Sequence, residues 1–292
     1  MQRLNGNSLR IAIQSSGRLT EPSIELLQGI GLDFEDHARR LFSRCRNFDL
    51  EILFVRDDDI PEYGQDRVAD LGIVGRNVFL ERAPRALELE RLGFGRCSLC
   101  LAVPVEAAAS APEDLAGSRI ATTHPNALRR YLAERGIEAR VIEIQGAAEL
   151  APALDVSDAI CDLVSTGTTL RMHDLRPLEE LWESEAILIA NPDALEVEDR
   201  RALIDRLRVR IQGLLTARRL KYVTLNAPAD RVEKIRRILP GMKSPTVVPL
   251  AEEGMVALHA AVEEEVFWDV MERIKAAGGS EILVLPVEKV MP

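Results

Sequence analysis

The chain has 292 residues, 47% of them hydrophobic, and a formal net charge of −10 at pH 7. This length suits two or three domains with packed cores, whereas the acidic balance disfavours sequence-independent nucleic-acid binding, which relies on clustered Lys and Arg. No apolar run reaches the length of a membrane span, and residues 1–6 show no signal-peptide core. We therefore expect a cytoplasmic protein with neither nucleic-acid nor membrane partners.

Apolar runs alternate with amphipathic stretches through residue 220, the pattern of α/β domains with largely parallel sheets. The first set comprises strands at 9–13, 51–55 and 70–74 and helices at 22–30 and 76–82. The second set comprises strands at 119–122 and 139–142 and helices at 124–135 and 147–154. Strands near 97–104 and 186–190 are predicted to connect the two sets.

Beyond this body the pattern changes. Apolar residues recur at helical spacing over 197–217, which predicts one long amphipathic helix. The elements that follow are strands at 221–227, 246–250, 255–262 and 282–287 and helices at 229–239 and 265–277. Their order, βαββαβ, predicts a ferredoxin-like module of about 70 residues.

Lysine and cysteine usage excludes some chemistry. The five lysines are Lys221, Lys234, Lys243, Lys275 and Lys289. A Walker-type phosphate loop and a Schiff-base enzyme both need a lysine, so neither is expected before residue 221. Cys97 and Cys100 form a C-x-x-C within a predicted strand, where residues three apart point to opposite faces, so core packing is favoured over metal or redox use.

The most informative segment is Asp158–Leu170, where an apolar strand with an acid near its end runs into a hydroxyl- and glycine-rich turn that starts a helix. Hydroxyls and backbone N–H groups at a helix start suit a phosphate, and the upstream acid suits sugar hydroxyls. The residues concerned are Asp162, Ser165, Thr166, Gly167, Thr168 and Thr169. A buried strand followed by a Ser/Thr-capped helix satisfies the same string.

Two further turns follow predicted strands, where ligands gather in open α/β sheets. Gln14–Leu19 contains Gly17 and Arg18, a guanidinium suited to phosphate, or else a solvated arginine. The second segment contains Asp70, Gly72 and Gly75. Its glycines allow close approach of a nucleotide, or serve turn geometry alone. The acids of Arg56–Pro61 could bind Mg²⁺, although acids ahead of a proline more often form a helix N-terminus.

Taken together, these motifs resemble a known family. They are Gln14–Leu19, Arg56–Pro61, Asp70–Gly75, Arg119–Pro125, Ala159–Leu170, Ser244–Thr246 and Ile282–Lys289. In this order, over essentially the whole chain, they resemble ATP phosphoribosyltransferase in its long, regulated form, the first enzyme of histidine biosynthesis. The competing interpretation is a bilobal small-molecule binding or sensor protein without catalysis.

The resemblance implies a bilobal catalytic body of the periplasmic-binding-protein type with a C-terminal ferredoxin-like regulatory domain. Its expected parts are lobe I at 1–102 and 188–219, lobe II at 103–187, and the regulatory domain at 220–292. The implied reaction joins N1 of ATP to C1 of 5-phosphoribosyl-1-pyrophosphate (PRPP) and releases Mg²⁺-bound pyrophosphate. Adenine N1 has a free lone pair, so no residue is expected to act as general base.

The same resemblance implies roles for individual residues. Asp162 and Ser165–Thr169 would bind PRPP, and the nucleotide side would comprise Gln14, Gly17, Arg18, Asp70, Gly72 and Gly75. The metal ligands stay unassigned. Many members carry lysine where this chain has Ser15. The cleft's positive charge is therefore left to backbone N–H groups, Mg²⁺ and arginines, with Arg18, Arg56, Arg76 and Arg171 as the candidates.

Regulation is implied in the same way. The C-terminal module resembles the family's histidine-binding domain, and such enzymes are typically homo-hexamers inhibited by histidine. Thr246 and Asn226 are the candidate effector residues. A module that only assembles the oligomer is the alternative, and the residues alone do not separate the two.

Overall fold

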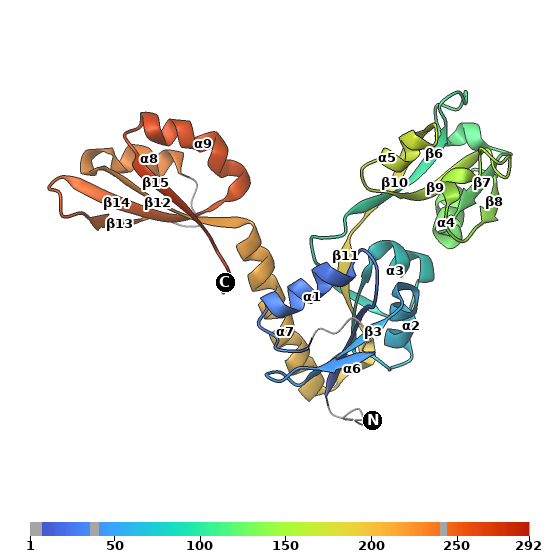
Figure 1. Ribbon diagram of the computed structural model, residues 1–292, viewed down its shortest axis with the longest axis horizontal. Helices are drawn as coiled ribbons and strands as arrows, with labels where there is room; N and C mark the ends of the chain where they lie inside the picture. The colour runs from blue at the N-terminus through green and yellow to red at the C-terminus, as the bar shows by residue number, and fades with distance from the viewer. Residues whose placement is uncertain (1–7, 36–40, 240–243, 292) are drawn as a thin grey trace. The chain divides into compact units, whose positions relative to one another are not determined.

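A computed structural model describes residues 8–35, 41–239 and 244–291. The chain divides into two compact units, residues 1–204 and 205–292, whose elements are labelled in Figure 1. The first unit contains two sheets and the second contains one. The predicted α/β class and the separate C-terminal sheet are both present.

The first sheet has the strand order β2-β3-β1-β4-β11-β5. Its strands are β1 (Leu9–Gln14), β2 (Phe42–Arg44), β3 (Leu50–Val55), β4 (Leu71–Gly75), β5 (Leu87–Arg91) and β11 (Ala186–Ala190). β1 runs parallel to β3 and β4, whereas β2, β5 and β11 pair antiparallel. The helices of this half are α1 (Thr20–Gly29), η1 (Asp57–Asp59), α2 (Ile60–Gln65) and α3 (Arg76–Arg82). One face of the sheet packs on α2 and α3 through apolar residues such as Val74 and Ile60.

The second sheet has the order β10-β6-β9-β7-β8. Its strands are β6 (Cys97–Pro104), β7 (Arg119–Thr122), β8 (Arg140–Glu143), β9 (Ala159–Val164) and β10 (Leu175–Ser184). Its helices are η2 (Pro112–Leu115), α4 (Pro125–Arg135), η3 (Ala148–Leu150) and α5 (Thr168–Met172). One face packs on α4 and the other on α5. The chain enters this sheet between β5 and β6 and leaves it between β10 and β11.

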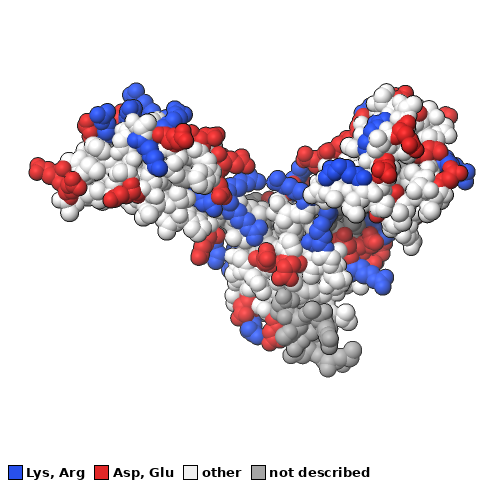
Figure 2. All heavy atoms as spheres, turned by 45° about the horizontal axis from the view of Figure 1, so that its top comes forward, with Lys and Arg blue, Asp and Glu red and all other residues white. Residues whose placement is uncertain are grey.

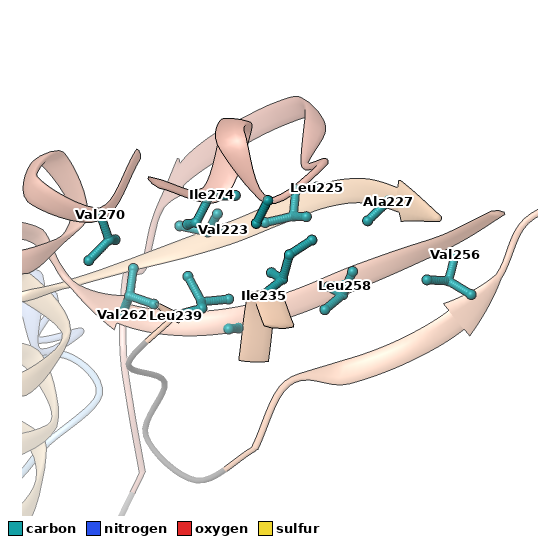
Figure 3. Packing of buried hydrophobic residues seen from close by; sticks show 12 residues of the cluster. Val223, Leu225, Ala227, Ile235, Leu239, Val256, Leu258, Val262, Val270 and Ile274 are labelled. Carbon is teal, nitrogen blue, oxygen red and sulfur yellow. The ribbon is translucent and has the colours of Figure 1, made fainter. Parts of the chain in front are cut away.

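The helices α6 (Pro192–Glu196) and α7 (Glu198–Arg218) follow β11. The remaining elements form a sheet of order β13-β14-β12-β15. They are β12 (Leu220–Pro228), η4 (Ala229–Arg231), α8 (Val232–Ile238), β13 (Thr246–Pro249), β14 (Met255–Glu263), α9 (Glu264–Ala276) and β15 (Ser280–Pro286). Alternate strand residues such as Val223 and Leu258 pack against Ile235 and Ile274 of the two helices, so the helices cover one face (Figure 3).

Charged side chains of both signs share the surface. On the face seen in Figure 2, Lys and Arg are interspersed with Asp and Glu.

Over the described ranges, no helix is both long enough and apolar enough to cross a membrane.

Some elements differ from the sequence prediction. The sheets of the body are mixed rather than largely parallel, and β2, β5 and β10 were not predicted. β10 contains Pro177 and several glutamates and pairs with β6 through two irregularities, so its period-2 pattern is obscured. The helix predicted at 147–154 is only the three-residue η3.

Candidate functional site

The candidate loops lie where parallel strands end. β1, β3 and β4 run in one direction, so the turns after Gln14, Val55 and Gly75 share one edge of the first sheet. β7 and β9 are likewise parallel, so the turns after Thr122 and Val164 share one edge of the second sheet. Ligands of open α/β folds bind outside such carboxyl ends.

The turn after β9 contains Ser165, Thr166, Gly167, Thr168 and Thr169. Gly167 has φ 69°, a conformation that favours glycine. The hydroxyls of Thr166 and Thr168 lie 3.1 Å apart, and Arg171 donates to Thr168 Oγ1 at 3.2 Å. Because α5 has only five residues, its dipole is that of little more than one turn. Hydroxyls, backbone N–H groups and Arg171 are therefore what this turn offers an anion.

Asp162 is held on one side only. Its Oδ1 accepts the N–H of Leu163 at 2.8 Å and the hydroxyl of Thr123 at 3.2 Å, while its Oδ2 has no hydrogen bond to any described residue. Burial raises the pKa of this carboxyl and the nearby Glu149 adds to the rise, although the two hydrogen-bond donors oppose it. Asp162, Glu149 and the hydroxyl turn line one cavity of about 60 Å³, so a second acid borders the same space.

A larger cavity of about 330 Å³ adjoins the same turn. It is lined in part by Arg76, Arg91, Arg96, Ser165, Glu183 and Glu185. Arg76 pairs with Glu88 at 3.2 Å and Arg91 pairs with Glu88 at 3.5 Å. Arg96, in contrast, is exposed and has no ion pair with any described carboxylate. Ser165 lines both cavities, so the hydroxyl turn and the arginine-lined space are contiguous.

The loop after β1 presents Arg18. Gln14 folds back to accept the N–H of Leu19 at 2.9 Å, so its amide oxygen is used within the loop. Gly17 has φ 130°, and a Cβ there would lie 2.5 Å from the Gln14 side chain. Arg18 is exposed, and its guanidinium donates to Cys97 Sγ at 3.2 Å, beside the arginine-lined cavity. Of the predicted nucleotide residues, Arg18 has a charged group available to a ligand.

Asp57 adds a carboxylate at the same edge of the first sheet. Its Oδ1 is buried and finds no hydrogen-bond partner in the described chain. Burial raises the pKa of Asp57 to about 6, Asp58 adds to the rise, and Arg18 opposes it. An unpartnered buried acceptor next to Arg18 suits a ligand that carries N–H groups.

Asp70 and Gly72 do not join this group. Asp70 precedes β4, at the opposite end of the strand from Gly75, where its buried carboxylate accepts the N–H of Arg10 at 2.9 Å and pairs with Arg200. At Gly72 a Cβ would lie 2.6 Å from Ile60. Asp70 is therefore used in contacts within the chain, and Gly72 leaves room for the side chain of Ile60. Gly75 does lie at the carboxyl edge, where a Cβ would collide with the side-chain oxygen of Asn77.

In the second unit, Thr246 and Asn226 lie on the sheet face that the helices leave open. Thr246 pairs with His259 across β13 and β14, and Asn226 pairs with Ala257 across β12 and β14, so both share a face with His259. The ring centroids of His259 and Tyr222 lie 5.9 Å apart with the ring planes tilted by 38°, and the buried Nδ1 of His259 lacks a hydrogen-bond partner within the described residues. Asn226 donates to Glu281. The sequence did not single out His259, although it lies midway along a predicted strand.

The four cysteines are buried thiols without disulfide bonds. Cys97 lies on the face of β6 shared with Leu99, and Cys100 lies on the opposite face. Burial raises the pKa of Cys100 to about 11, so this thiol is protonated at neutral pH. In the part of the chain that the structure describes, no three His, Cys, Asp or Glu side chains converge as a metal site.

Comparison with known proteins decides the family. Residues 56–213 match the family described as ATP phosphoribosyltransferase, and residues 217–289 match the family described as the HisG C-terminal domain. The chain belongs to the ATP phosphoribosyltransferase family.

Two phosphoribosyltransferases and one binding protein of known structure are similar to this chain. The ATP phosphoribosyltransferase of Cytophaga hutchinsonii is 46% identical over 283 residues, covering 97% of this chain and 98% of that protein. The ATP phosphoribosyl transferase (HisG:HisZ) complex from Thermotoga maritima is 30% identical with a TM-score of 0.60, covering 70% of this chain and 98% of that one. The match to the alkanesulfonate-binding protein SsuA from Xanthomonas axonopodis pv. citri spans 98% of this chain and 88% of that protein, with 17% identity and a TM-score of 0.46.

An ATP phosphoribosyltransferase transfers the phosphoribosyl group of PRPP to N1 of ATP, the first step of histidine biosynthesis, and this chain is such an enzyme. The alternative of a binding or sensor protein is not favoured.

The sequence analysis did not single out Glu149, Arg91 and Arg96, which border the cavities. Glu149 lies in a segment predicted as an ordinary helix, and Arg96 lies in a glycine-rich link between the two sheets.

Proposed function

We propose that the two contiguous cavities of the first unit bind the two ends of PRPP. Ser165–Thr169 and Arg171 bind the 5′-phosphate, and Asp162 and Glu149 face the ribose hydroxyls. The arginine-lined cavity takes the pyrophosphate. The observation that supports this proposal is that Ser165 lines both spaces, so that the hydroxyl turn, Asp162 and the arginine-lined cavity with the guanidinium of Arg96, which has no ion pair to a described carboxylate, adjoin one another.

The chemistry demands little beyond positioning and charge. Adenine N1 has a lone pair and needs no base, so the barrier is lowered by orienting the two substrates and by stabilising the charge that leaves. Arg96 and Arg18 have no carboxylate partner in an ion pair among the described residues, which leaves their charge for pyrophosphate. They are our candidates for the arginines that supply the positive charge absent at Ser15.

On the nucleotide side, Asp57 supplies a hydrogen-bond acceptor for the 6-amino group of adenine. As N1 attacks, electron density moves from the 6-amino group of adenine into the ring, so that amino group becomes a stronger hydrogen-bond donor. The unpartnered Oδ1 of Asp57, next to Arg18, is suited to accept from it. Gln14, whose amide oxygen is occupied by Leu19, keeps the shape of the loop.

Mg²⁺ fits this arrangement as an ion that accompanies the substrate. It prefers oxygen ligands and usually binds one or two carboxylates together with substrate phosphates and water. Asp162 and Glu149 border the same cavity and would hold it. When bound, Mg²⁺ would neutralise charge on the pyrophosphate.

The reaction is tested by incubating the protein with ATP, PRPP and Mg²⁺ and measuring released pyrophosphate as the phosphate that an added pyrophosphatase forms from it, which also draws the reaction forward. We expect pyrophosphate release that needs both substrates and, in an assay without the pyrophosphatase, stops when EDTA is added. Binding of ATP and PRPP without release of pyrophosphate would contradict the proposed function and favour a sensor.

Regulation is proposed for the second unit. We infer that residues 220–292 form a regulatory domain and that histidine binds at its open sheet face near Thr246, Asn226 and His259, in a cytoplasmic homo-hexamer. Thr246→Ala should raise the histidine concentration needed for inhibition, with turnover in the absence of histidine changed much less. Unchanged inhibition of Thr246→Ala and of Asn226→Ala would place the effector elsewhere.

A further inference from the structure

His124 is a buried titratable residue to which the proposed function assigns no role. It precedes α4, at the end of the loop after β7, and is 8% exposed. Its two ring nitrogens both have side-chain partners. Nδ1 lies 2.8 Å from the hydroxyl of Thr123, and Nε2 lies 3.0 Å from Nδ2 of Asn77.

These contacts belong to a longer chain of hydrogen bonds. At one end, Thr123 Oγ1 donates to Oδ1 of Asp162 at 3.2 Å. At the other end, Ser184 Oγ donates to Oδ1 of Asn77 at 3.0 Å and accepts the backbone N–H of Asn77 at 2.9 Å. The chain therefore runs from Asn77, after β4 of the first sheet, to Asp162 on β9 of the second.

The direction of every bond follows from the carboxylate. An ionised Asp162 only accepts, so the proton of Thr123 points to it and Thr123 Oγ1 must accept from Nδ1–H of His124. Nε2 is then an acceptor and receives Nδ2–H of Asn77. This arrangement requires a neutral histidine, and burial lowers the pKa of His124, although the nearby charges of Asp162, Glu81 and Asp58 oppose the change.

The chain also explains which oxygen of Asp162 is available. Oδ1 is saturated by Thr123 and the N–H of Leu163, whereas Oδ2 has no bond with any described residue. Gly75 contributes indirectly, because a Cβ at that position would displace the side-chain oxygen of Asn77. Asn77 lies in α3 and His124 directly precedes α4. A second contact joins these two helices, because Glu81 of α3 accepts the N–H groups of Asn126 and Ala127 at the start of α4.

We propose that His124 is a positioning residue. Acting through Thr123, His124 fixes Oδ1 of Asp162 and leaves Oδ2 for the sugar hydroxyls. The hydrogen bond from Asn77, which follows β4, joins His124 to the first sheet. This inference rests on the proposed role of Asp162 in binding PRPP. A misdirected carboxylate would weaken PRPP binding and leave the ATP site intact.

The test is a double-mutant cycle with Thr123→Val and His124→Gln, read as KM for PRPP and KM for ATP. Thr123→Val keeps the shape of the side chain and removes the hydroxyl, and Thr123→Ser is its control because it keeps the hydroxyl. We expect each single variant to raise KM for PRPP about three- to tenfold with KM for ATP almost unchanged. Thr123→Ser should restore KM for PRPP to near the native value.

The double variant decides whether His124 acts through Thr123. We expect its KM for PRPP to match the weaker-binding single variant, because the second change removes nothing further. A KM that equals the product of the two single effects would overturn the proposal, as would single variants with native KM for PRPP. Asp162→Asn separates the proposed PRPP site from the proposed role of His124. If this variant keeps the native KM for PRPP, the proposed site is wrong. If the variant raises KM for PRPP while the effects of Thr123→Val and His124→Gln are additive, only the role of His124 is wrong.

Discussion

The two loops that face the candidate site are held very differently. On the second sheet, Asp162 is fixed by Thr123 and the N–H of Leu163, and Thr123 is in turn fixed by His124. On the first sheet, Arg18 is exposed, and among the described residues its side chain donates a hydrogen bond to Cys97 alone. We therefore expect the proposed sugar side to be organised before substrate arrives and the arginine side to become ordered when the ligand binds. Substitutions in the two regions should therefore fail in different ways.

The largest effect is expected on the organised side. Asp162→Asn removes the charge that we propose to contact PRPP and disturbs the hydrogen bonds that end on Oδ1, so kcat/KM for PRPP should fall about ten- to a hundredfold. Steady-state kinetics with PRPP varied at saturating ATP provide the measurement. Native kcat/KM would show that the carboxylate has no contact with the substrate.

On the open side, Arg18→Ala and Arg96→Ala should each lower kcat/KM about tenfold without changing Tm, because neither guanidinium has an ion pair to a described carboxylate. Arg67→Ala is the matched control, since that arginine pairs with Asp193. Its kinetics should stay native. A fall in Tm for Arg18→Ala or Arg96→Ala would mean that the loop is as organised as the sugar side.

Asp70→Asn should show the reverse, a loss of stability without a loss of activity. Asp70 is buried, pairs with Arg200 and accepts the N–H of Arg10. Weakening these contacts should lower the free energy of unfolding by about 1–3 kcal/mol, as measured by urea denaturation. A large change in KM for ATP with native stability would return Asp70 to the nucleotide site.

The smallest effect concerns pH. The folded protein keeps the proton of Asp57 up to about pH 6, whereas the unfolded chain releases it near 3.8, so stability from the protonated form is lost as pH rises through 6. Asp57→Asn abolishes this ionisation and should raise the free energy of unfolding by about 1–2 kcal/mol at pH 7.5. At pH 4 the gain should shrink. An equal gain at both pH values would exclude ionisation as its cause.

The sequence predicted those features that reside in one continuous segment. Asp162 and the hydroxyl turn adjoin each other along the chain, so their pattern was visible, as was the βαββαβ order of the second unit. The network around His124 was not, because Asn77 and Asp162 come from separate strands and meet only in the fold. Asp70 was assigned to the nucleotide side because a sequence pattern does not show that β4 begins at Leu71, which puts Asp70 at its amino end.

The most direct test of the account titrates the two halves of PRPP separately. Ribose 5-phosphate and pyrophosphate would each be titrated calorimetrically into the native protein, Thr169→Ala and Arg96→Ala. We expect Thr169→Ala to weaken ribose 5-phosphate about tenfold and leave pyrophosphate unchanged, and Arg96→Ala to do the opposite. If each variant weakened both ligands alike, or if the pattern were reversed, the division of the site into a sugar-phosphate turn and an arginine-lined pyrophosphate cavity would be contradicted.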